Sequence, residues 1–105
     1  MERIIMARVV AGLLYNTETA ELIADVARTG GDWNYERTQL FRTKNSRFYL
    51  AGEGGAATRW AQRITGDRGY VEGDGVIPLT DAEARLYVER FANHRFDEFF
   101  ECADA

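Results

Sequence analysis

Residues that build catalytic and metal sites are scarce in this chain of 105 residues. Cysteine, histidine, serine and lysine occur once each, as Cys102, His94, Ser46 and Lys44. One cysteine closes no disulfide within the chain, and one histidine with one cysteine does not make a metal ligand set. Nucleophilic catalysis needs a nucleophile and a base held together, and the tail that carries Cys102 and His94 is too simple to build an oxyanion hole. We therefore expect no enzyme, no metal and no cofactor.

Proline and long apolar runs are also scarce. Pro78 is the one proline, and no Pro-rich or Gly/Ser-rich run divides the chain, so we expect a single domain, residues 1–105, around one modest core. No apolar run approaches the ~20 residues of a membrane span. The first fourteen residues are interrupted by charges and lack the cleavage pattern of a signal peptide. We expect a cytoplasmic protein with no membrane partner.

Two short runs in the middle of the chain have the pattern of a β-hairpin. Residues 39–43 and 47–51 alternate apolar and polar side chains, as a strand with a covered face requires. This alternation predicts that Phe48 and Leu50 share one face and that the residues between them point to the other. Asn45 lies in the intervening turn, where it tolerates a positive φ.

A glycine-rich corner, Gly52-Glu53-Gly54-Gly55, follows the hairpin. Glycines allow close approaches that a Cβ would block, so we expect the strand to end here. Apolar residues then recur at helical spacing and predict a short amphipathic helix that packs back on the sheet: Ala57, Trp60, Ala61 and Ile64. A phosphate-binding nest at this corner is disfavoured, because the spacing matches no nucleotide motif and Glu53 would repel an anion.

The N-terminal half leaves one choice open. Residues 3–14 predict one or two short strands around a turn at Gly12. Residues 19–27 alternate as in a strand but also carry a helical stripe, and their intrinsic propensity favours helix. If they form a strand, they complete a three-stranded antiparallel meander with the hairpin.

The clearest local signal starts a helix at Asp81. Thr80 is an N-cap and Glu83 completes a capping box. The apolar stripe of this helix consists of Ala84, Tyr87, Val88 and Phe91, and a last short helix carries Phe96, Phe99 and Phe100. The sequence thus predicts an α+β fold: a small three-stranded antiparallel meander, covered by a short helix after a glycine corner, with C-terminal helices.

Charge is divided along the chain. Residues 37–68 hold seven cations against two anions, a balance of +5, and residues 72–105 hold nine anions against three cations, a balance of −6. The candidate acidic contacts for a partner are Glu89, Asp97, Glu98 and Glu101. The candidate basic and aromatic contacts are Arg42, Lys44, Arg47, Tyr49, Arg59, Trp60 and Arg63. The sequence does not say whether the two regions meet in the folded chain.

Three motifs resemble a family of small proteins of bacterial phages and mobile elements. They are YNTETAELIA (residues 15–24), LFRTK and FYLAGEGGA (40–44 and 48–56) and IPLTDAEA (77–84), against the family pattern YxTxTAxxIA, LYRTKxGxFFLxGEGG and IxPLTxxEAxxW. Asn45-Ser46 replaces the family's turn glycine and Tyr87 its helix tryptophan. Some members resemble anti-CRISPR proteins that inhibit type II effectors. The resemblance implies a strand at residues 19–27 and a non-enzymatic inhibitor.

Our first hypothesis is therefore an anti-CRISPR protein that binds and occludes a Cas effector with its acidic C-terminal carboxylates and an aromatic anchor, Tyr49 or Trp60. The alternative is a small nucleic-acid-binding or regulatory module that uses the basic region, although a sequence pI near 5.0 opposes general affinity for a polyanion. A self-associating structural domain is a third possibility. The sequence leaves the oligomeric state and the identity of the partner open.

Overall fold

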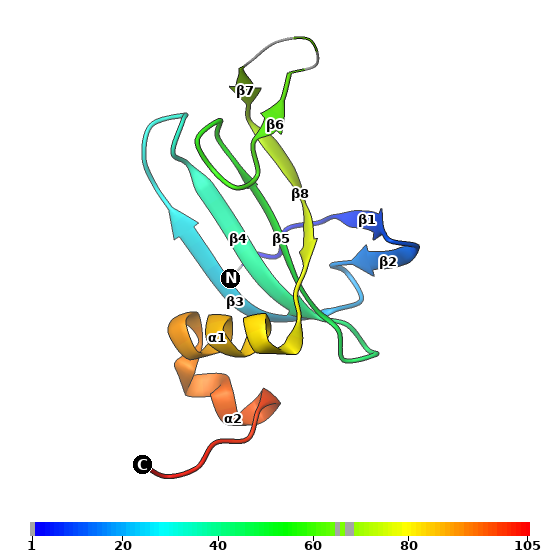
Figure 1. The fold of residues 1–105 in the computed structure, drawn as a ribbon, viewed down its shortest axis with the longest axis vertical. Helices are drawn as coiled ribbons and strands as arrows, with labels where there is room; N and C mark the ends of the chain where they lie inside the picture. Colours follow the sequence, from blue (N-terminus) through cyan, green and yellow to red (C-terminus); the bar gives the residue numbers. More distant parts are fainter. Residues whose placement is uncertain (1, 65, 67–68) are drawn as a thin grey trace.

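A four-stranded antiparallel sheet forms the body of the molecule in the computed structural model, which describes residues 2–64, 66 and 69–105 (Figure 1). Its strands, in spatial order, are β3 (Glu21–Arg28), β4 (Glu36–Arg42), β5 (Phe48–Gly54) and β8 (Gly73–Pro78). Two small hairpins pair β1 (Ala7–Val10) with β2 (Leu13–Asn16) and β6 (Gln62–Arg63) with β7 (Tyr70–Val71). The helical elements are α1 (Asp81–Phe91), a 3₁₀ turn (Asn93–Arg95) and α2 (Phe96–Phe99).

The antiparallel strands and the C-terminal helices of the predicted α+β fold are present. Residues 21–28 form a strand, which answers the choice that the sequence left open. Each strand of the main sheet runs antiparallel to its neighbour, and β3, β4 and β5 follow one another both in sequence and in space.

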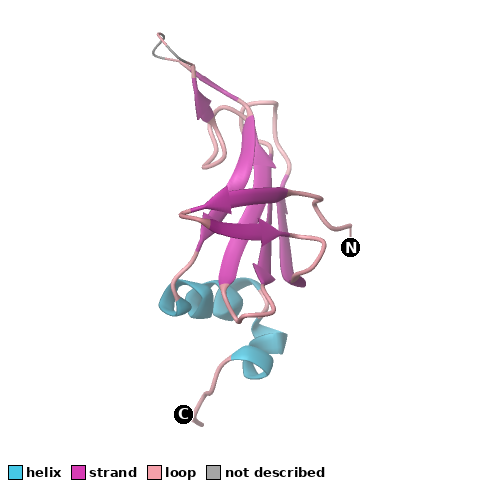
Figure 2. Cartoon of the chain, turned by 90° about the vertical axis from the view of Figure 1, so that its right-hand side faces the viewer, coloured by secondary structure: helices cyan, strands magenta, loops and turns pink. Residues whose placement is uncertain are grey.

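Both faces of the main sheet are covered. The predicted alternation is confirmed, because Phe48 and Leu50 pack in a cluster with α1 while Tyr49 and Ala51 pack in a second cluster on the opposite face. The second cluster lies beneath the N-terminal segment and the β1–β2 hairpin, which crosses the sheet in Figure 2. When both faces of a sheet are covered, successive side chains of its central strands are all buried, although they point to opposite faces.

The buried side chain of Gln39 ties the N-terminal segment to the sheet. Its amide oxygen accepts a hydrogen bond from the Ile4 N–H at 2.7 Å, and its amide nitrogen donates to the Glu2 carbonyl at 2.7 Å. The β1–β2 turn then places Ala11 at φ 51° and Gly12 at φ 80°, which are the paired positive values of a tight hairpin turn. The predicted short strands around Gly12 are therefore confirmed.

The predicted helix over residues 57–64 is wrong. This segment consists of turns followed by the short strand β6. The backbone is drawn across to the loop before β4, where the N–H of Gly55 donates to the Tyr35 carbonyl and the N–H of Ala57 to the Trp33 carbonyl. Trp60 inserts its ring against the sheet and covers it in place of a helix.

The capping box at the start of α1 is confirmed. The Thr80 hydroxyl accepts from the Glu83 N–H at 3.1 Å, and the Glu83 carboxylate accepts from the Thr80 N–H at 2.9 Å. Ala84 and Val88 are fully buried on the sheet, while Phe91 at the end of the helix remains 41% exposed. The cap thus fixes where the chain leaves β8 and turns under the sheet.

We predict that Thr80→Ala lowers the free energy of unfolding by about 0.5 to 2 kcal/mol, because it leaves an orphan N–H in the first turn. Urea denaturation measures this loss. The hydrogen bonds from the Thr80 backbone and side chain also lower the pKa of Glu83. The stabilisation by this carboxylate should therefore be present above the ordinary Glu pKa and be lost as the pH falls through the lowered value. Equal urea midpoints for the variant and the parent would contradict the assigned role of the cap.

Candidate functional site

The acidic candidates gather around the last two helical elements. Glu89 and Asp97 line a surface pocket of about 550 Å³ together with His94 and Cys102, and Glu101 is exposed on the tail beyond α2. The aromatic side of α2 anchors this region, because Phe48 of β5 packs against Phe99 and Phe100 with ring centroids 6.3 and 5.4 Å apart. Asp97 on α2 and Glu89 on α1 are therefore held on the folded body of the protein.

The basic and acidic regions meet through a chain of four charged side chains. Arg42 lies 3.0 Å from Glu21, Glu21 lies 3.0 Å from Arg95, and Arg95 lies 2.9 Å from Glu98. The hydrogen bond from Arg95 lowers the pKa of Glu98, which keeps this carboxylate ionised. The charge of Glu98 is therefore largely balanced within the chain, whereas no described cation forms an ion pair with Glu89, Asp97 or Glu101.

The basic candidates do not form one surface. Arg42, Lys44 and Arg47 lie at the β4–β5 turn, at the end of the sheet near α1 (Figure 1). Arg63 lies in β6, at the opposite end. Arg59 is 3.7 Å from Glu36 at the start of β4 and lines a groove beside α1, away from the β4–β5 turn. The excess of positive charge along residues 37–68 is thus split between two ends of the sheet.

The two aromatic candidates are in the core. Tyr49 is fully buried, and burial raises its pKa to about 12. Trp60 is 4% exposed, and its indole N–H donates to the Thr38 hydroxyl at 2.9 Å. Neither side chain is accessible to a partner in this conformation. The prediction that Tyr49 or Trp60 anchors a partner is therefore wrong for this conformation. The alternation of the strand predicted the two faces correctly but did not show that both are covered.

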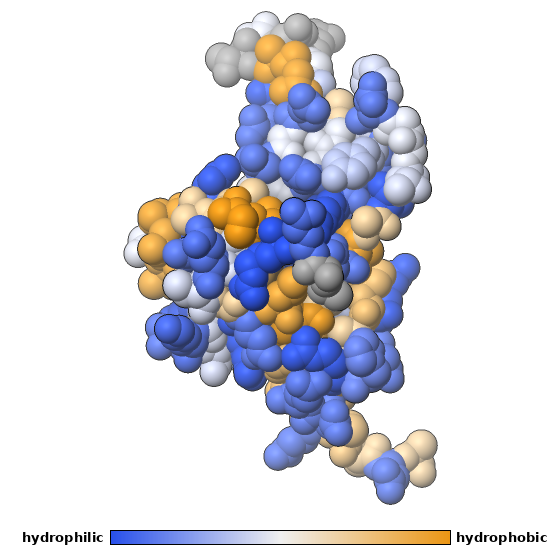
Figure 3. All heavy atoms as spheres, turned by 180° about the vertical axis from the view of Figure 1, so that it is seen from behind, coloured by the Kyte–Doolittle hydropathy of each residue, from blue (hydrophilic) through white to orange (hydrophobic). Residues whose placement is uncertain are grey.

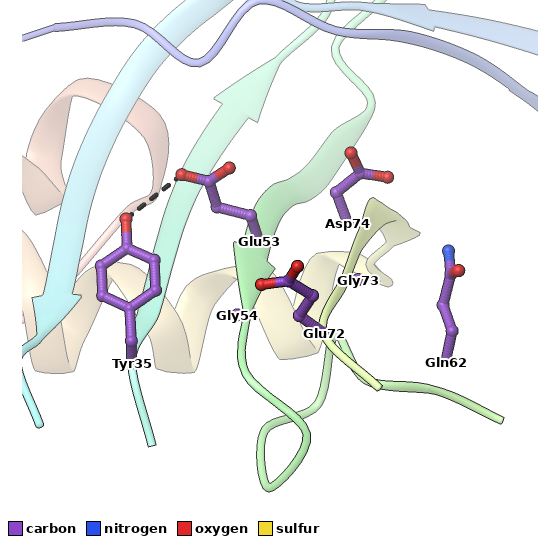
Figure 4. A pocket seen from close by; sticks show the side chains of 7 residues that line it. All are labelled: Tyr35, Glu53, Gly54, Gln62, Glu72, Gly73 and Asp74. Carbon is purple, nitrogen blue, oxygen red and sulfur yellow. Dashed lines mark hydrogen bonds between the residues drawn. The ribbon is translucent and has the colours of Figure 1, made fainter. Parts of the chain in front are cut away.

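A carboxylate-lined hollow lies at the end of the sheet away from the β4–β5 turn, and none of its residues is among the partner contacts predicted from the sequence. It has a volume of about 460 Å³ and is lined by Tyr35, Glu53, Glu72 and Asp74, among others (Figure 4). Glu53 and Asp74 face each other across β5 and β8, and Tyr35 donates to Glu53 at 3.2 Å. Burial and this hydrogen bond raise the pKa of Tyr35. The sequence did not predict this hollow because it does not show the pairing register, which brings Glu53 opposite Asp74.

Apolar side chains are exposed on the N-terminal hairpin and the segment before it (Figure 3). Val9 and Leu14 are directly opposite each other and are 68% and 61% exposed, and Ile5 is 66% exposed. Their strand neighbours Val10 and Tyr15 turn inward to the second cluster. The hairpin therefore uses one face for the core and presents the other to solvent.

Comparisons of the chain with protein-family models, with curated proteins and with solved structures gave no match. Within the described residues, no group of three or more His, Cys, Asp and Glu side chains is arranged to hold a metal ion. No helix in the same part of the chain has the length and apolarity needed to cross a membrane.

Proposed function

We propose that the protein is a non-enzymatic inhibitor from a phage or mobile element that binds a Cas effector and occludes its nucleic-acid site. The observation that carries the proposal is the set of exposed carboxylates Glu89, Asp97 and Glu101 at the C-terminal end. Among the residues that the structure describes, none of the three has a cationic group within 4.0 Å. The resemblance of the motifs between residues 15 and 84 to small phage proteins supports the choice of partner.

The mechanism is electrostatic occlusion. An effector that binds nucleic acid has a channel lined with lysine and arginine, and fixed carboxylates are complementary to such a channel. Glu98 contributes less to this surface than its neighbours, because Arg95 already balances its charge. Phe48 packs against Phe99 and Phe100 and so holds α2, which carries Asp97, in place before binding.

The test is a triple charge reversal, Glu89→Lys, Asp97→Lys and Glu101→Lys, in a DNA-cleavage assay with purified Cas effectors. We predict that the variant inhibits at least about tenfold more weakly, because each reversed charge meets like charges in the channel. Pull-down of the effector from nuclease-treated lysate should fall in parallel. The matched control is Glu2→Lys, Glu18→Lys and Asp32→Lys, which changes the net charge equally at exposed positions elsewhere.

Unchanged inhibition by a folded triple variant would remove the acidic surface from the mechanism. Loss of inhibition in both triple variants would assign the effect to net charge alone. Recovery of nucleic acid instead of an effector, lost on nuclease treatment, would favour the alternative in which Arg42, Lys44 and Arg47 bind nucleic acid. Because the basic residues are split between two ends of the sheet, we expect no gel shift even at low salt.

A further inference from the structure

The outer edge of β3 is open along half of its length. β3 pairs only with β4 in the main sheet and forms one of its two edges (Figure 1). At its start the register shifts between Leu22 and Ala24, and the Arg95 guanidinium donates to the carbonyls of Leu22 and Ile23 at 3.1 and 3.3 Å. Along residues 25–28, the backbone bonds to no described residue other than those of β4. An open edge of this kind is a template for another strand.

A groove runs beside this open edge. It has a volume of about 610 Å³ and lies between the last residues of β3 and the C-terminal half of α1. Leu86 and Phe91 of the helix line it and are 66% and 41% exposed. Tyr87 lies between them in sequence and is partly buried in the same groove. The apolar side chains of Leu86, Tyr87 and Phe91 therefore lie beside the edge to which a further strand would be added.

The groove carries an excess of positive charge. Its cations are Arg28, Arg59 and Arg90, and its carboxylates are Glu36 and Glu83. Glu36 pairs with two of these cations, Arg28 at 3.2 Å and Arg59 at 3.7 Å, and Glu83 belongs to the capping box. The cations therefore exceed the carboxylates by one. The Arg28 side chain remains 67% exposed. No described carboxylate lies within 4.0 Å of Arg90, which packs on the Phe91 ring at 5.1 Å.

We propose that this groove binds an extended, acidic segment of a partner protein, which adds as a further strand at the open edge of β3. Backbone pairing along residues 25–28 supplies affinity, and the alternation of the added strand turns every second side chain toward α1. An apolar side chain of the segment packs on Leu86 and Phe91, and a carboxylate lies between Arg28 and Arg90. The charge of the groove selects an acidic segment over a basic one.

This binding mode goes beyond the proposed function and uses a different surface. The carboxylates of the C-terminal end are complementary to a basic channel, whereas the groove is complementary to an acidic strand. An experiment can therefore contradict the groove proposal without contradicting the proposed function, and the reverse. The groove is tested with peptides alone and needs no effector, so its outcome does not depend on the inhibition assay.

The experiment selects a displayed library of random dodecapeptides on the full chain. We expect enriched peptides that alternate apolar and acidic residues. Leu86→Glu with Arg90→Glu should weaken their binding at least about tenfold, since the pair reverses the groove's charge and removes its apolar contact. The matched control is Ala82→Glu with Arg85→Glu, which makes the same change in net charge at exposed positions on the same helix outside the groove. Both double variants are first compared with the parent by thermal unfolding.

Amide resonances locate the peptide. Binding should shift the amides of residues 25–28 and slow their hydrogen exchange, which a charge contact with the helix alone would not do. The proposal is overturned if no peptide is enriched, if the groove variant and its control bind the peptides equally, or if the shifts fall elsewhere on the molecule.

Discussion

Replacing Trp60 by alanine should remove a large part of the stability of the protein. The ring is 4% exposed and packs in the cluster between the main sheet and α1. A buried tryptophan truncated to alanine costs about 3 to 5 kcal/mol, because the site does not collapse around the lost volume. The change also leaves the buried Thr38 hydroxyl without the indole N–H that lies 2.9 Å from it. A domain of this size has a total stability of about 5 to 15 kcal/mol, so urea unfolding should show a much lower midpoint.

Trp33→Ala is the matched control, because Trp33 is 69% exposed in the loop before β4. It removes the same side chain, and we expect its effect to stay within about 0.5 kcal/mol. Trp60→Phe should lie between the two, since it keeps a ring in the core but loses the hydrogen bond and part of the buried ring volume. Equal urea midpoints for the two alanine variants would show that Trp60 does not serve as the cover of the sheet.

The parts of the fold that the sequence predicted correctly are those set by near neighbours. The capping box involves Thr80 and Glu83, which are three residues apart, and its hydrogen bonds form as the sequence implies. The two faces of β5 follow from strict alternation, and the tight turn at Gly12 follows from the freedom of glycine to adopt φ 80°. In each case the feature depends on a pattern of residues close in sequence, so that the pattern and the structure coincide.

The predicted helix over residues 57–64 failed because distant contacts override local periodicity. The spacing of Ala57, Trp60 and Ile64 fits a helix, but the backbone bonds to Trp33 and Tyr35 hold the corner against another loop. Tyr49 was assigned to a partner surface because its strand face was read as open. The N-terminal segment covers that face through Gln39, which contacts residues more than thirty positions away.

The charged regions show the same limit. The basic and acidic regions are separate in the sequence, which left open whether they meet in the folded chain. Folding joins them, because Arg95 bonds Glu21 across 74 residues and Glu21 also pairs with Arg42. Folding separates Arg42 from Arg63. Both belong to the basic stretch of the sequence, but they lie at opposite ends of the sheet. The net charge of a segment of the sequence therefore does not predict whether a surface of the folded protein is positive or negative.

Gly55→Ala should destabilise the protein by about 3 kcal/mol or more, at the upper end of the range for inserting an atom into a packed site. A Cβ on Gly55 would lie 2.0 Å from the Asp32 carbonyl oxygen and 2.6 Å from that of Trp33. Both obstacles are backbone atoms, which have no rotamer to change. Relief requires the corner to separate from the loop before β4, and this breaks the Gly55 to Tyr35 and Ala57 to Trp33 hydrogen bonds. Thermal unfolding measures the loss.

The control for this prediction lies in the β3–β4 loop, which the glycine corner contacts. A Cβ on Gly31 would meet nothing within 4 Å. Gly31→Ala should therefore be neutral or stabilising by about 0.4 to 1 kcal/mol, because alanine restricts the unfolded chain. If the two alanine variants unfold at the same temperature, close approach is not the reason for the glycine at position 55. If Gly55→Ala alone unfolds early, the glycine corner is needed for the contact between β5 and the β3–β4 loop. The same contact keeps Trp60 over the sheet, since Trp60 follows the corner by five residues.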